Sequence, residues 1–158
     1  MVFAAAITPY MLQGDDNPAG PLTKKKAATM AKDLTADEDS FYDEFTTQFF
    51  SVDGQLKVTE AQRQEAIALC HQADKKVALK AMASFGATDF RDDLPNVTVP
   101  TLVLHGDGDA TVPFEGSGAR THQAIADSEL VVLPGAPHGC NVSHADQFNA
   151  ALLDFLQK

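Results

Sequence analysis

Two segments decide the fold of this chain: PTLVLHGDGDATVP at residues 100–113 and LVVLPGAPHG at residues 130–139. Each starts with a short apolar run rich in β-branched residues and then breaks into glycine, aspartate and proline. That pattern is typical of a buried strand that ends in a turn. Because the carboxyl ends of parallel strands form one edge of an open α/β sheet, where chemistry is usually placed, we expect Asp109 and His138 to lie at the same edge.

An aspartate and a histidine placed in this way fit two of the roles in a catalytic triad. Imidazole is the side chain whose ordinary pKa allows it to take up and return a proton near neutral pH. A buried carboxylate on the other ring nitrogen fixes the tautomer and stabilises the imidazolium. Taken singly, a glycine-flanked aspartate is usually a turn former and a lone histidine a surface residue. Asp107 competes for the acid role, and we expect His105 to pack or to form a hydrogen bond rather than to react.

The same residues resemble a known family. HGDGDATVP followed by GAPHG is similar to the C-terminal half of an α/β-hydrolase, closest to the bacterial non-haem haloperoxidase (perhydrolase) and arylesterase branch. In that fold the triad runs in the order Ser, Asp, His, and Asp109 and His138 match the acid and the base. The resemblance implies an ester hydrolase or perhydrolase that acts on a small ester or carboxylic acid without a cofactor.

The nucleophile of that family is missing from the sequence. A nucleophile elbow requires Gly-x-Ser-x-Gly on a strand-to-helix turn. No serine of the chain lies in that motif; the serines are Ser40, Ser51, Ser84, Ser117, Ser128 and Ser143. Neither Cys70 nor Cys140 is placed to replace it, and the family's oxyanion-hole donors are absent with the serine. The sequence therefore contains a candidate acid and base only.

The remainder of the chain predicts a single partial α/β domain over residues 1–158 with about three parallel strands, Val2–Ile7, Thr101–Leu104 and Leu130–Leu133. Residues 14–88 contain a turn-rich loop and a string of short helices, the position at which the resemblance implies a cap or lid. Residues 89–158 hold the candidate acid and base, with a helix expected over about Glu115–Ala126.

Three further signals predict where helices begin. Thr35-Ala36-Asp37-Glu38 and Thr59-Glu60-Ala61-Gln62 have the form of a capping box, and Ser143 is a candidate cap for the terminal helix. After the first box, Phe41, Phe45 and Phe49 follow at helical spacing. A stripe of this kind is usually core packing, although in a lid it also faces the substrate.

The composition excludes several classes of partner. A net charge of −10 argues against nucleic acid and anionic membranes, and no run approaches the length of a transmembrane helix. Two cysteines give no disulfide framework, and the apolar start lacks a basic segment, so a cytoplasmic location is expected. A metal site built from His138, His144 and Asp146 has no recognised ligand spacing.

Two functions remain open at this stage. One is a hydrolase whose serine comes from a missing N-terminal half; the other is an inactive, truncated relative that acts as an assembly module. The resemblance implies that the strand Val2–Ile7 would pair on its far side with the strand of the missing elbow. Left open, an apolar edge invites pairing between chains, so we expect a homo-oligomer through this edge.

Overall fold

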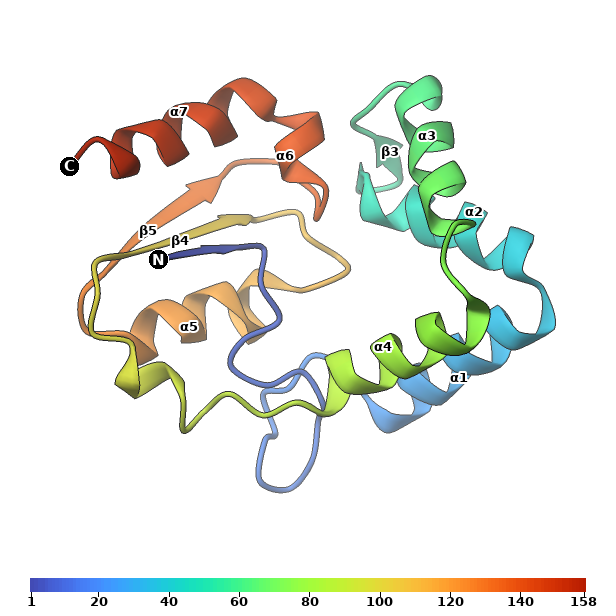
Figure 1. Ribbon diagram of the computed structural model, residues 1–158, viewed down its shortest axis with the longest axis horizontal. Helices are drawn as coiled ribbons and strands as arrows, with labels where there is room; N and C mark the ends of the chain where they lie inside the picture. The colour runs from blue at the N-terminus through green and yellow to red at the C-terminus, as the bar shows by residue number, and fades with distance from the viewer.

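The computed structural model describes residues 1–158 and consists of a parallel sheet with flanking helices and a short two-stranded antiparallel hairpin (Figure 1). In chain order the elements are β1 (Val2–Ala4), α1 (Lys24–Ala36), α2 (Glu38–Phe49), β2 (Ser51–Val52), β3 (Gln55–Leu56), α3 (Glu60–Cys70), α4 (Lys75–Ala87), the 3₁₀ turn Leu94–Asn96, β4 (Thr101–Gly106), the 3₁₀ turn Phe114–Gly116, α5 (Gly118–Ala124), β5 (Ser128–Leu133), α6 (Cys140–Ser143) and α7 (Ala145–Leu156). None of the helices has the length and hydropathy needed to cross a membrane.

The sheet has the strand order β1-β4-β5, and both pairs are parallel. The expected α/β class with three parallel strands is confirmed. Helices α7 and α5 cover opposite faces of the sheet (Figure 1). One face holds the core cluster of Leu102, Leu104, Leu133, Ala136 and Cys140, against which apolar residues of α7 pack. Strand β4 is buried along its whole length, so the loop that leaves it starts from a fixed point.

Strand β1 is shorter than the expected Val2–Ile7. It ends at Ala4, because Ala5 has a φ of 46° and turns the chain out of the sheet. The N–H of Ala5 still donates to the carbonyl of Leu104 at 2.8 Å. An alanine rarely adopts the left-handed region, so the apolar run gave no sign of this early end.

Helices α1 to α4 form a separate layer beside the sheet (Figure 1). The expected capping box at Thr59 is confirmed, since its hydroxyl accepts from the N–H of Gln62 and the Gln62 side chain accepts from the N–H of Thr59. The box expected at Thr35 is wrong. Thr35 lies inside α1 and its hydroxyl donates to the carbonyl of Ala31, while Asp37 caps α2 by accepting from the N–H of Ser40.

The region between β4 and β5 also differs from the expected single helix over Glu115–Ala126. The 3₁₀ turn Phe114–Gly116 comes first, and α5 spans only Gly118–Ala124. The two are separated at Ser117, whose buried hydroxyl donates to the carbonyl of Pro113 at 2.7 Å. Ser143 does not cap the terminal helix, because its hydroxyl pairs with Nδ1 of His144 at 2.9 Å.

Candidate active site

The loops that follow β4 and β5 are joined by hydrogen bonds. The N–H of Gly108 donates to the carbonyl of Ala136 at 3.1 Å, and the N–H of Gly135 donates to the Asp107 carboxylate at 2.6 Å. Glycine is required at Gly106 because a Cβ there would collide with the carbonyl of Ala136. Close approach of the two loops, rather than an unusual backbone angle, therefore explains this glycine.

Asp109 and His138 meet at this junction. Asp109 Oδ2 lies 2.7 Å from His138 Nδ1, and the other oxygen, Oδ1, accepts the backbone N–H groups of Thr111 and Val112 at 2.9 and 2.7 Å. Asp109 is only 5% exposed. Asp107 points instead to the N–H of Gly135, so the geometry places Asp109 and not Asp107 against the histidine.

The surroundings hold the Asp109 carboxylate in its ionised form. Burial by itself would raise its pKa, but hydrogen bonds from His105 and His138, the positive charge of His138 when protonated and the N–H of Val112 together lower the pKa below the ordinary value. An ionised carboxylate at this distance is an acceptor for Nδ1–H of His138. The tautomer with its lone pair on Nε2 is thereby favoured, as a general base requires.

The second nitrogen of His138, Nε2, has no hydrogen-bond partner within the chain. The ring packs edge-on against Phe49 of α2, with centroids 4.7 Å apart at 82°. The side chain is 16% exposed and lines the wall of a cavity. His138 thus has one nitrogen fixed and one free to meet a reactant.

The end of α2 is bonded to both loops of the site. The Gln48 side-chain amide donates to the carbonyl of Ala110 at 3.0 Å, and the N–H of Gly139 donates to the carbonyl of Phe49 at 3.0 Å. The helix therefore fixes the residue after Asp109 and the residue after His138. Sequence reasoning missed this connection, because bonds to backbone carbonyls leave no residue pattern.

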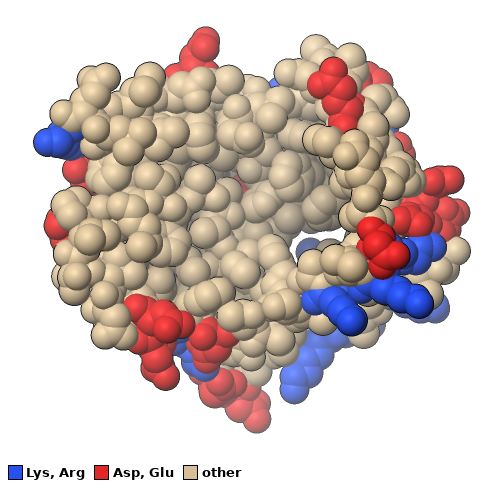
Figure 2. Space-filling model, viewed as in Figure 1, with Lys and Arg blue, Asp and Glu red and all other residues tan.

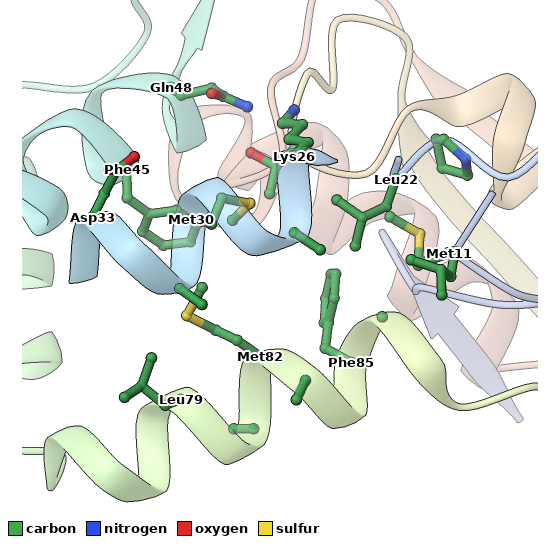
Figure 3. Close-up of a pocket in the computed structure, with 18 of the residues that line it drawn as sticks. Met11, Leu22, Lys26, Met30, Asp33, Phe45, Gln48, Leu79, Met82 and Phe85 are labelled. Carbon is green, nitrogen blue, oxygen red and sulfur yellow. The ribbon is translucent and has the colours of Figure 1, made fainter. Parts of the chain in front are cut away.

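A cavity of about 700 Å³ extends from His138 among helices α1, α2 and α4, the loop before α1 and the loop after β4. Its wall is mainly apolar, and Met11, Leu22, Met30, Phe45, Met82 and Phe85 are drawn in Figure 3. Phe41, Phe45 and Phe49 all line it, so the aromatic stripe faces the cavity. The space-filling view shows a hollow on the face where the sheet and the helical layer meet (Figure 2).

The other residues considered from the sequence do not join the pair. No group of three or more His, Cys, Asp or Glu side chains is arranged to hold a metal ion, and His138, His144 and Asp146 form no such group. Cys140 is buried, and burial together with the charge of Asp109 raises the pKa of its thiol. Because the thiolate is the reactive form, this cysteine is poorly suited to act as a nucleophile.

Comparison with known proteins identifies the family of the chain. A family model of α/β-hydrolases, described as TAP-like protein, matches residues 58–158. The chain belongs to the α/β-hydrolases.

The relatives of this α/β-hydrolase chain include proteins named as haloperoxidases and esterases. A putative non-heme chloroperoxidase from Synechocystis sp. is 37% identical over 99% of this chain and 56% of its own length. Among solved structures, bromoperoxidase from Bacillus anthracis matches with a TM-score of 0.97 and 42% identity, over 99% of this chain and 57% of that one. An esterase from Exiguobacterium antarcticum matches with a TM-score of 0.90 and 28% identity, over 99% and 56%. The chain spans a little more than half the length of these relatives, and its match is to the C-terminal part of the fold.

The lowered pKa of Asp109 predicts a pH-dependent contribution to folding stability. The unfolded chain binds a proton at the ordinary aspartate pKa, about 3.9, and the folded chain does so only at lower pH. The contribution is therefore present above that value and is lost as the pH falls through the folded pKa. In urea unfolding between pH 3 and pH 7, the stability difference between wild type and Asp109→Asn should shrink below about pH 4. A constant difference over this range would contradict the assignment.

Proposed function

We propose that this chain supplies the acid and the base of a serine-dependent carboxylic ester hydrolase or perhydrolase. The observation that carries the proposal is the 2.7 Å contact between Asp109 Oδ2 and His138 Nδ1 at the wall of an apolar cavity. The names of the relatives, chloroperoxidase, bromoperoxidase and esterase, support the same class.

The proposed reaction divides the work between the two residues. His138 Nε2 takes the proton of a serine hydroxyl as the oxygen attacks the ester carbonyl, and it then returns the proton to the leaving alcohol. Asp109 stays ionised and stabilises the imidazolium formed in between. The resulting acyl-enzyme is released to water, which gives the acid, or to hydrogen peroxide, which gives the peracid.

The serine must come from polypeptide outside these 158 residues, because no serine of the chain lies in an elbow motif. In the relatives, the part of the fold that this chain does not match makes up the remaining four-tenths or so of the length. We place the missing strand against β1, whose outer edge has no neighbour in the sheet. The helices within residues 14–88 then act as the lid, and residues 89–158 carry the acid and the base.

The cavity suggests the substrate class. Its wall holds methionine, leucine and phenylalanine side chains from α1, α2, α4 and the loop before α1 (Figure 3). Burial of apolar surface is worth roughly 25 cal/mol per Å², so an apolar or aromatic acyl group gains binding energy there. Small esters of such acids are the substrates that we propose.

The test compares two proteins on p-nitrophenyl acetate, butyrate and benzoate. The first is the chain alone, which should show no turnover above its His138→Ala variant. The second, termed the complemented protein, joins this chain behind the N-terminal part of the Bacillus anthracis bromoperoxidase that the match leaves uncovered. It should hydrolyse the esters, with kcat/KM larger for butyrate or benzoate than for acetate. No turnover by a folded complemented protein would contradict the proposal, and equal rates for all three esters would contradict the acyl pocket.

The alternative function is assembly without catalysis. Strand β1 is an unpaired edge formed by the apolar residues Val2, Phe3 and Ala4. In this function the edge pairs with a second copy of the chain, and the mass of the chain in solution tests it.

A further inference from the structure

His105 is a second histidine beside Asp109, and the proposed reaction does not use it. It lies near the end of β4 and is 0% exposed. Its Nε2 is 2.8 Å from the carbonyl oxygen of Val112 and 3.2 Å from Asp109 Oδ2. Its other nitrogen, Nδ1, is buried and has no hydrogen-bond partner.

These contacts define the tautomer of the ring. Both groups near Nε2 are acceptors, so a lone pair on that nitrogen would face two oxygens without a hydrogen between them. A hydrogen on Nδ1 would be a buried donor without an acceptor, which costs more than a lone pair without a donor, because a buried N–H is rarely left unpaired. Nε2 therefore carries the hydrogen, which is donated to the Val112 carbonyl at 2.8 Å and lies on the side of the ring that faces Asp109 Oδ2, 3.2 Å from Nε2.

We infer that His105 is a positioning residue for Asp109: its Nε2–H bonds Oδ2 and turns the carboxylate so that this same oxygen faces His138. The inference deepens the proposed function and rests on it for its role in catalysis. The hydrogen bond itself is a property of this chain alone. Asp109 Oδ1 accepts two backbone N–H groups, and Oδ2 faces two histidine nitrogens, His138 Nδ1 at 2.7 Å and His105 Nε2 at 3.2 Å.

His105 differs from the other titratable groups around the Asp109 carboxylate. The titratable groups that face Asp109 are His105 from β4, His138 from the loop after β5, and the Cys140 thiol of α6, whose own pKa the charge of Asp109 raises. No lysine or arginine pairs with it. His138 gains a positive charge and loses it again during turnover, whereas His105 is enclosed and keeps its position throughout the cycle. A buried carboxylate with several donors stays ionised.

Helix α5 holds the His105 ring in place. A Cβ added to Gly118, the first residue of α5, would lie 2.6 Å from Nδ1 and 3.0 Å from Cγ of His105. The ring therefore packs directly on the helix backbone, and the aromatic ring of Phe114 lies 5.7 Å away on another side. With no space to turn, Nε2 keeps its direction toward Asp109.

The first experiment reads the tautomer directly in the wild-type chain, from the ¹⁵N chemical shifts of the two His105 ring nitrogens at pH 7. We expect Nε2 to be protonated and Nδ1 to carry a lone pair. A spectrum in which Nδ1 carries the hydrogen would overturn the inference, because His105 could then not donate to Asp109. This measurement needs no substituted protein and no activity.

The second experiment follows the ¹³Cγ signal of Asp109 during a pH titration of three proteins. In wild type the pKa of Asp109 should lie below its ordinary value. His105→Phe keeps a ring but removes the donor, so the pKa of Asp109 should rise. His105→Gln is the matched control, because its amide nitrogen can reach the position of Nε2, and it should keep the pKa low.

Two results would contradict the inference here: an Asp109 pKa in His105→Phe equal to that of wild type, or equal increases in both variants. If His105→Phe does not fold, the inference is still tested by the ¹⁵N shifts of His105 in wild type and by the pKa of Asp109 in His105→Gln. In the complemented protein, His105→Phe should lower kcat more than it raises KM, and His105→Gln should restore part of the loss. Normal titration results without turnover in the complemented wild type would reject the proposed function and leave the hydrogen bond established.

Discussion

The complemented protein should lose on the order of 10⁴-fold or more in kcat/KM when His138 is replaced by alanine. The loss is large because His138 would be the only group able to accept the serine proton, and its Nε2 has no other partner in the chain. The initial rate of p-nitrophenyl butyrate hydrolysis at pH 7.5 measures it. Asp109→Asn should lower kcat/KM by about 10⁴-fold, since an amide next to Nδ1 no longer selects the tautomer that can act as a base.

The matched control is His122→Ala. His122 lies on α5, and its Nδ1 pairs with the hydroxyl of Ser128, away from the candidate site. Its replacement should leave the rate within a few-fold of wild type if the protein stays folded. If His138→Ala retains a tenth of the wild-type activity, His138 is not the general base, whatever the effect of Asp109→Asn.

The chain alone should associate with itself through β1. Along one strand of a parallel pair, every second residue forms its backbone hydrogen bonds with the same neighbouring strand. Met1 and Ala5 form such bonds with β4. The backbone groups of Val2 and Ala4 therefore face away from the sheet. Figure 2 shows few charged atoms over the part of the molecule where Figure 1 places β1. By contrast, β5 at the opposite edge carries the ion pair Glu129–Lys158 at 2.6 Å.

Light scattering at tens of micromolar should give a mass above that of the monomer, and Ala4→Lys should return it to the monomer value. Ala4 is exposed at the edge, and a lysine there opposes pairing between strands. Ala28→Lys on the exposed side of α1 adds the same charge elsewhere and should leave the mass unchanged. A monomeric wild type would reject the assembly function, and it would leave the proposed half-enzyme as the only candidate.

Much of the sheet and of the candidate site could be predicted from the sequence, for a physical reason. Residues 101–104 and 130–133 are short runs rich in β-branched and apolar residues, which are typical of buried parallel strands, and turn residues follow each strand. Because the two strands are parallel, the loops that follow them lie at the same edge of the sheet. Topology places the two loops together, but the choice of Asp109 over Asp107 was implied by the family resemblance, and the contact with His138 is seen only in the structure.

Other features needed three-dimensional information. The hairpin of β2 and β3 did have a signal, since its turn is Asp53-Gly54 with φ of 50° and 74°, the Asp-Gly pair that tight hairpins favour. The left-handed Ala5 had none. The orientation of His105 had none either, because its partners are a carbonyl oxygen and an aspartate whose position depends on the finished loop.

The two hydrogen bonds from the end of α2 also bear on how such proteins can be recombined. Gln48 and Phe49 belong to the helical layer by sequence, yet they bond to the residues that follow Asp109 and His138. The Phe49 acceptor is a backbone carbonyl, which any exchanged helical layer also supplies, whereas the Gln48 donor is a side chain that the exchange can remove. A crossover placed before Gln48 keeps this donor and the loop that it holds within one parent.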